Sequence, residues 1–332
     1  MTPKIVEPGY LALYRSGELE RRAEALEVRL VSCDICPREC GVNRLKGEEG
    51  FCRSAHLPIV SAVCAHFGEE PVISGSRGSG TIFLGNCNMR CVYCQNYQIS
   101  QDWAGQQSRQ MDCRTLAERM LYLQDERDCH NINLVSPSHF VPQIVRALRE
   151  AVPMGFRLPL VYNSSGYDSV GTLKELDGII SIYLPDLRYA SNSIARRFSQ
   201  SIGYVRHARA AIREMYRQVG NLVVDGEGIA RRGLIVRHLI LPHGLTGSQN
   251  SLTWLVREVS LAVTVSIMSQ YSPVFRASEI PLLSRKITIS EYEEVCRLLD
   301  ELGLENGWVQ EMGASENYLP DFTREGNPFL PA

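Results

Sequence analysis

The chain has 332 residues, of which 44% are hydrophobic and 22% charged, and its formal net charge at pH 7 is −2. This length allows one large domain with an extension. The nearly balanced charge argues against a general binder of nucleic acid or of membrane surfaces, which would carry an excess of basic residues. We therefore expect neither a nucleic-acid partner nor a membrane partner.

The N-terminal residues and the cysteine content together indicate the cellular compartment. The first ten residues lack the apolar core of a secretory signal, and no apolar run approaches the roughly 18 residues that span a membrane. The chain contains 11 cysteines. Cytosolic thiols stay reduced, and clustered cysteines there bind metal more often than they form disulfides. We therefore expect a cytoplasmic protein.

The N-terminal part predicts helices followed by a turn-rich cysteine group. Apolar residues at helical spacing predict one or two amphipathic helices over residues 10–30. Glycine and proline then interrupt the chain, and four thiolates in such a region can close a zinc site or hold a second iron–sulfur cluster. Free buried cysteines are the alternative. The four residues are Cys33, Cys36, Cys40 and Cys52.

A histidine and two carboxylates stand just before a Gly/Ser-rich stretch. His66, Glu69 and Glu70 can line a site, or they can form a solvated or structurally paired turn. The Gly/Ser-rich stretch over 75–80 marks a domain boundary. We predict a helical, cysteine-rich, metal-binding extension over residues 1–75 and a main domain over residues 76–332.

From Gly80 onward, short apolar strands alternate with helical segments, which implies parallel strands joined by right-handed crossovers. Six such units are fewer than the eight of a closed barrel. We therefore predict an α/β fold, an open partial (β/α)6 barrel of the TIM type. The strands are expected over 81–84, 132–135, 158–162, 179–184, 234–241 and 262–268, and the helices near 116–124, 144–148, 173–176, 194–198, 210–219, 252–259 and 289–302.

The loop after the first of these strands carries three cysteines. Cys87, Cys91 and Cys94 are separated by three and two residues. A structural zinc site and a [4Fe–4S] cluster both usually take four protein ligands. Three thiolates leave one metal position open, which is where chemistry occurs. A partial zinc site and three unrelated core cysteines are the alternatives.

The Cys87-x3-Cys91-x2-Cys94 spacing, with Tyr93 before the last cysteine, resembles the signature of the radical S-adenosylmethionine (SAM) superfamily. The resemblance implies a [4Fe–4S] cluster on the three cysteines, with SAM bound to the open iron. It also implies cleavage of SAM to methionine and a 5′-deoxyadenosyl radical, which abstracts hydrogen from a substrate. The partial barrel is the fold that this resemblance implies.

Polar residues follow the predicted strands, where ligand groups gather in parallel α/β folds. Asp186 can accept a hydrogen bond from the SAM ribose, and Arg188 can pair with the SAM carboxylate. A surface ion pair is the alternative for these two residues. Tyr93 can cover the adenine or shield the cluster. Other polar groups at or near strand ends are 136–139, 163–167, Arg237, His238, 242–244 and 269–271.

Longer stretches resemble the activating enzymes of glycyl radical enzymes, and most closely the PflX-like branch of homologues of pyruvate formate-lyase activating enzyme. In that family an Asp-x-Lys contacts SAM, and here Arg188 replaces the lysine. The resemblance places Asn163 near the SAM carboxylate. The family's Gly-Gly-Glu, which binds the SAM ammonium, is replaced here by residues 136–139. The matching stretches are 33–41, 87–100, 162–167, 183–189 and 237–247.

We therefore predict a radical SAM enzyme. The resemblance implies a one-electron reductant such as flavodoxin or ferredoxin and, as substrate, a backbone glycine of a glycyl radical enzyme. One alternative is modification of another protein or a small molecule by the same chemistry. Another is a non-catalytic iron–sulfur or zinc protein that transfers electrons or scaffolds partners. The predicted cluster ligands are Cys87, Cys91 and Cys94, and the predicted SAM-binding residues are Tyr93, Asn163, Asp186 and Arg188.

Overall fold

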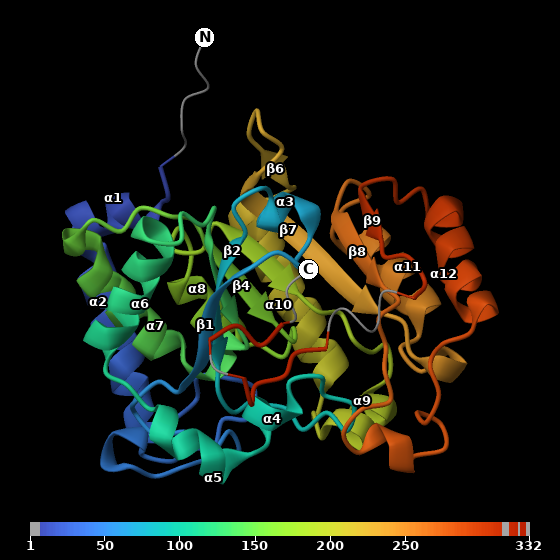
Figure 1. The fold of residues 1–332 in the computed structure, drawn as a ribbon, viewed down its shortest axis with the longest axis horizontal. Helices are drawn as coiled ribbons and strands as arrows, with labels where there is room; N and C mark the ends of the chain where they lie inside the picture. Colours follow the sequence, from blue (N-terminus) through green and yellow to red (C-terminus); the bar gives the residue numbers. More distant parts are fainter. Residues whose placement is uncertain (1–6, 314–318, 325, 330–332) are drawn as a thin grey trace.

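A nine-stranded sheet forms the centre of the computed structural model, which describes residues 7–313, 319–324 and 326–329 (Figure 1). The strand order is β1-β2-β3-β4-β5-β7-β8-β9, and β6 pairs with β7 off this path. The strands are β1 (Val60–His66), β2 (Ser79–Leu84), β3 (Ile132–Val135), β4 (Leu160–Ser164), β5 (Ile182–Pro185), β6 (Val223–Val224), β7 (Ala230–Leu239), β8 (Thr264–Met268) and β9 (Gly307–Val309).

The sheet is parallel from β2 to β9 along this order, whereas β1 is antiparallel to β2 and β6 is antiparallel to β7. In the described part of the chain no pairing joins β9 back to β1. The sheet is therefore open, and the predicted α/β fold with a partial barrel is confirmed. Because the strands are parallel, their carboxyl ends meet at one edge of the sheet.

Helices follow most of the parallel strands, as the alternating pattern predicted. They lie outside the sheet, with α2, α6 and α7 beyond β1 in Figure 1 and α11 and α12 beyond β8. Their bounds are α1 (Tyr10–Arg15), α2 (Glu18–Val28), α3 (Pro71–Ser74), α4 (Tyr97–Ser100), α5 (Trp103–Gln106), α6 (Cys113–Asp125), α7 (Val141–Ala151), α8 (Val170–Glu175), α9 (Asn192–Ser199), α10 (Tyr204–Val219), α11 (Ser248–Glu258) and α12 (Ile289–Leu302).

Helix α12 shows how local sequence fixes an element. The Thr288 hydroxyl accepts from the backbone N–H of Glu291, and the Glu291 carboxylate accepts from the backbone N–H of Thr288, which makes a capping box. Gly303 ends the helix with φ 67°, a left-handed conformation that glycine adopts without a Cβ penalty. The helix has the bounds that its apolar periodicity predicted.

All six predicted strands occur, and β1, β6 and β9 are additional. Strand β1 lies within residues 1–75, and it pairs with β2 through contacts such as Val63 with Ile82. The sheet therefore continues across the predicted domain boundary. Strand β9 has three residues, two of them exposed, and so short a segment carries no usable periodicity.

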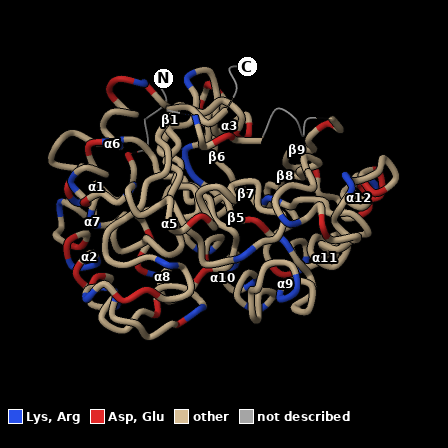
Figure 2. Tube along the Cα trace, turned by 60° about the horizontal axis from the view of Figure 1, so that its bottom comes forward, with Lys and Arg blue, Asp and Glu red and all other residues tan. Residues whose placement is uncertain are grey.

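Charges of both signs are interspersed over the outer helices (Figure 2). This distribution agrees with the small net charge of −2. Among the described residues, no helix combines the length and apolar character needed to cross a bilayer.

Candidate functional site

The cysteine loop leaves β2 through a tight and buried turn. At Gly85 a Cβ atom would lie 2.4 Å from Cγ2 of Ile59, so only glycine fits there. Asn86 adopts φ 62°, and its backbone N–H donates to the carbonyl of Ile99 over 2.7 Å. That bond closes the base of the loop. The loop is also held to the end of α9, where Val92 N–H donates to the carbonyl of Phe198 over 2.9 Å.

Each of the three loop sulfurs has a polar neighbour. The Cys91 sulfur accepts from Arg188 Nη1 over 3.1 Å and from the Ser199 hydroxyl over 3.0 Å. The Cys94 sulfur lies 3.2 Å from the Ser100 hydroxyl, and the Cys87 sulfur accepts from the Met89 N–H over 3.4 Å. Hydrogen bonds to cysteine sulfur tune the potential of an iron–sulfur cluster. These surroundings suit thiolate ligands.

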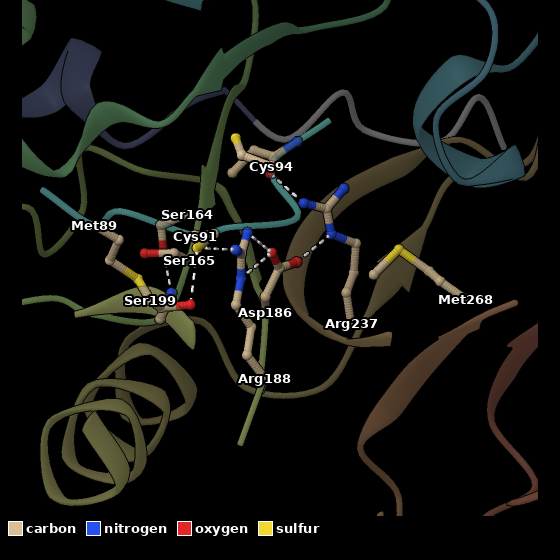
Figure 3. A network of polar contacts seen from close by, with 12 residues as sticks. Met89, Cys91, Cys94, Ser164, Ser165, Asp186, Arg188, Ser199, Arg237 and Met268 are labelled. Carbon is tan, nitrogen blue, oxygen red and sulfur yellow. Dashed lines mark hydrogen bonds and ion pairs between the residues drawn. The ribbon is translucent and has the colours of Figure 1, made fainter. Parts of the chain in front are cut away.

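A chain of ion pairs runs from the cysteine loop across the strand ends (Figure 3). Arg188 donates to Oδ2 of Asp186 from Nε over 3.0 Å and from Nη2 over 2.6 Å. The other oxygen, Oδ1, accepts from Arg237 Nε over 2.8 Å. Arg237 also donates to Oδ1 of Asn163 over 2.6 Å and lies 3.5 Å from Oε2 of Glu69. Asp186 therefore has arginine partners on both oxygens.

These groups line one cavity of about 540 Å³, together with residues at the carboxyl ends of β3, β7 and β8. The volume falls within the range of roughly 300–1,000 Å³ that is typical of small-molecule sites. Its polar lining includes Cys94, Asn163, Asp186, Arg188, Arg237, Glu69 and Glu70, and its apolar lining includes Phe83, Leu239, Met268, Trp308 and Phe329.

Burial and charge pairing set the ionisation of the lining carboxyls. Burial of Asp186 opposes ionisation, but the guanidinium groups of Arg237 and Arg188 hold its pKa below the usual value. Burial raises the pKa of Glu69 against the pull of Arg237. Burial also raises the pKa of Glu70 to about 7, with Arg237 opposing the rise and Glu69 adding to it. Perturbed carboxyls in a cavity are typical of functional sites.

The structure brings most of the predicted site residues to this cavity. Tyr93, Cys94, Asn163, Asp186 and Arg188 all line it. The Tyr93 hydroxyl also bonds to the hydroxyl of Tyr189. Cys87 and Cys91 do not line the cavity, although Cys91 reaches it through Arg188.

The segment 136–139 lies outside the large cavity. His139 is buried, its Nε2 lies 3.0 Å from the Gly85 carbonyl, and its own carbonyl accepts from Arg44 over 2.7 Å. None of residues 136–139 lines the large cavity.

Three residues of the site were not among the predicted ligands. Arg237 interrupts the apolar run Leu234–Val236 of β7 with a charge, and that contrast was the available signal. Glu70 was noted only as a possible lining residue, and the cavity includes it. Ser199 ends α9 with no distinguishing pattern, so only the structure places its hydroxyl on Cys91.

The four N-terminal cysteines lie together around a second, small cavity of about 10 Å³, which also touches Arg44 and His139. The Cys40 sulfur accepts from the Phe51 N–H over 3.4 Å, and Arg44 Nη1 lies 4.0 Å from the Cys33 sulfur. The backbones of Arg38 and Ser54 bond to Cys36 and Cys52, respectively. The cavity is lined by Cys33, Cys36, Cys40 and Cys52.

All cysteines are free thiols, and among the described residues no three Cys, His, Asp or Glu side chains are already arranged as a metal-binding group. Burial raises the pKa of Cys94 to about 12. A buried thiol of this kind is ionised only when a cation stabilises the thiolate, and a bound metal supplies one. The donor chemistry of the loop therefore fits a metal centre.

Known proteins resemble this chain in sequence and in fold. No protein-family model matches the chain. The uncharacterized protein MJ0674 of Methanocaldococcus jannaschii is 27% identical over 289 residues, which are 86% of this chain and 80% of that protein.

Two solved structures of HydG, a maturase of the FeFe-hydrogenase, resemble the chain. One has a TM-score of 0.50 at 11% identity and covers 92% of this chain and 68% of HydG. The other, from Carboxydothermus hydrogenoformans, has a TM-score of 0.49 at 12% identity and covers 75% of this chain. The match spans only 57% of that second HydG chain. At these identities the likeness is one of fold.

Proposed function

We propose that this protein is a radical SAM enzyme. The observation that carries the proposal is the link from the cysteine loop to the cavity, in which Arg188 binds both the Cys91 sulfur and the Asp186 carboxylate. Cys87, Cys91 and Cys94 would hold a [4Fe–4S] cluster, and the cavity beside them would bind SAM. Once bound and reduced, the cluster supplies the electron that cleaves SAM to a 5′-deoxyadenosyl radical.

The protein's own residues would hold SAM and exclude water. Arg188 and Arg237 supply positive charge in the cavity beside the cysteine loop, and Asn163 offers an amide on the adjoining strand. Both oxygens of Asp186 accept from arginine, so a ribose hydroxyl would share Asp186 with these partners. Buried aromatic rings, among them Tyr93 at 4% exposure, limit the access of solvent to reactive intermediates.

The sequence resemblance supports a protein substrate. We propose that the enzyme abstracts hydrogen from a backbone glycine of a partner enzyme, with a flavodoxin or ferredoxin as electron donor. Incubation with a candidate partner should then give a glycyl radical signal in electron paramagnetic resonance. A modified small molecule or protein without that signal would favour the alternative substrates.

The test of the core proposal is anaerobic SAM cleavage. The protein is reconstituted with iron and sulfide, reduced and given SAM, and 5′-deoxyadenosine is measured. We expect product from the wild type and none from Cys94→Ala, whereas Cys296→Ala, a change on α12 outside the loop, should behave as the wild type. A full and reducible cluster that leaves SAM intact would refute the proposal and favour an electron-transfer or scaffold role.

We propose further that the N-terminal cysteine group binds one zinc ion. Four sulfurs line the small cavity, and its volume of about 10 Å³ suits a single ion better than a cubane cluster. Metal analysis of the triple variant Cys87→Ala/Cys91→Ala/Cys94→Ala tests this. Stoichiometric zinc would support the proposal. Iron with sulfide would instead indicate a second cluster, and a metal-free protein would remove the site.

A further inference from the structure

Glu70 is a buried carboxyl group that forms no direct salt bridge with another described residue, although the charge of Arg237 acts on it. It is 8% exposed and lines the large cavity. Its Oε2 atom is buried and has no hydrogen-bond partner among the described residues, whereas Ser266 and the neighbouring Glu69 side chain bond to the carboxyl group. A buried charge is costly unless another charge pairs with it. An unpartnered oxygen on a side chain that lines a cavity therefore points to a partner that enters with a ligand.

The two arginines that line the cavity already pair with carboxylates other than Glu70. Asp186 takes Arg188 on one oxygen and Arg237 on the other, and Glu69 lies 3.5 Å from Arg237. Three carboxylates, two of them buried, thus share two guanidinium groups. His66 adds no charge at neutral pH, because burial lowers its pKa to about 4.

The surroundings of Glu70 also favour an alkyl chain. The cavity wall also includes Trp308 and Phe329, and the Phe329 ring stacks on His66 with 3.9 Å between ring centroids. An aliphatic stem can pack on such rings while its charged head meets the carboxylate.

We propose that the cavity binds its ligand through an alkylammonium group seated on Glu70, with Glu69 as the neighbouring carboxylate. The ammonium donates to Oε2 of Glu70. Glu69 is at the opposite end of the ion-pair chain from Cys91, so the ammonium lies at the end of the cavity away from the cysteine loop. The inference rests on the proposed function in one respect: SAM on the open iron would lie at the cysteine loop, so the ammonium on Glu70 belongs to the second substrate.

The first test uses n-butylamine and its neutral counterpart n-butanol as probes of the full-length chain. Binding is measured by calorimetry at pH 7.5 without iron or reductant. We expect butylammonium to bind at least tenfold more tightly than butanol, and Glu70→Gln to remove that preference. Glu214→Gln is the matched control, because Glu214 is equally buried at 8% exposure but lies on α10 and is paired with Arg217. Equal binding of the two probes, or full binding to a folded Glu70→Gln variant, would overturn the inference.

A second measurement identifies the source of the ammonium. SAM is compared with an analogue that lacks the α-amino group. If loss of the amino group weakens binding to the wild type but not to Glu70→Gln, and butylamine competes with SAM, then SAM supplies the ammonium and the assignment to the second substrate is overturned. If the second substrate supplies it, both SAM forms bind Glu70→Gln as they bind the wild type, and butylamine binds together with SAM. Since the probe experiment needs no cluster, failure to cleave SAM would refute the proposed function and leave this inference standing.

Discussion

The guanidinium group of Arg188 donates a hydrogen bond from Nη1 to the sulfur of Cys91 over 3.1 Å, although the two residues are 97 positions apart in the chain. The same group holds Asp186 through Nε and Nη2. One side chain thus connects the candidate cluster loop with the candidate ligand cavity.

Arg188→Lys should impair SAM cleavage. A lysine ammonium is a single point charge and cannot reproduce the planar fork that reaches both Cys91 and Asp186. Loss of one charge-assisted hydrogen bond of about 1.5–3 kcal/mol corresponds to a rate reduction of roughly 10- to 100-fold. The rate of 5′-deoxyadenosine formation measures this. Arg196→Lys, on the exposed side of α9, is the control, and a wild-type rate for Arg188→Lys would contradict the bridging role.

Ser199→Ala should make a reconstituted cluster harder to reduce. The Ser199 hydroxyl donates to the Cys91 sulfur over 3.0 Å, and hydrogen bonds to sulfur raise the potential by stabilising the reduced state. Ser201→Ala is the matched control, because that buried hydroxyl donates to the Ala195 carbonyl instead. A redox titration followed by electron paramagnetic resonance should show a lower potential for Ser199→Ala alone. Equal potentials for the two variants would count against the sulfur contact.

Arg237→Met should destabilise the fold. The change leaves Asp186 and Glu69 short of a cation, and removal of one partner from a buried ion pair costs about 3–5 kcal/mol. Urea unfolding at pH 7 measures the loss. The double variant Arg237→Met/Asp186→Asn should regain part of it, because the amide removes one of the stranded charges. If the double variant is no more stable than the single one, the Asp186–Arg237 pair is not the cause.

Glu70→Gln should change how stability depends on pH. Burial raises the pKa of Glu70 from 4.5 to about 7, so the folded state binds this proton more tightly than the unfolded state does. The resulting stabilisation is complete below about pH 4.5 and is lost as pH rises to about 7, by on the order of 3 kcal/mol. The groups that act on Glu70 are Glu69, Arg237 and Ser266.

Urea unfolding between pH 5 and 8 tests this prediction. Glu70→Gln should lose less stability than the wild type over that interval, since glutamine does not ionise. His66 contributes little to the difference, because its pKa of about 4 keeps it neutral in the folded state over this range and it is present in both proteins. Parallel stability curves for the two proteins would exclude a raised Glu70 pKa.

The features that depend on residues close together in the chain could be predicted from the sequence. The apolar run 81–84, followed by Gly85 and Asn86, predicted a strand that ends in the cysteine loop, and the structure has that arrangement. The apolar periodicity of 289–302 predicted the bounds of α12. Strand and helix alternation predicted an open parallel sheet, because each parallel pair needs a crossover connection.

Which charged residues pair across long sequence distances is seen only in the folded structure. Asp186 and Arg237 are 51 positions apart and pair because β5 and β7 are neighbours, with a parallel bridge between these two residues. Glu70 reaches the cavity because β1 adds to the sheet beside β2, which the local pattern of 60–66 did not reveal. Strand order and register set these contacts, and since they depend on the packing of the whole chain, spacing along the sequence does not specify them.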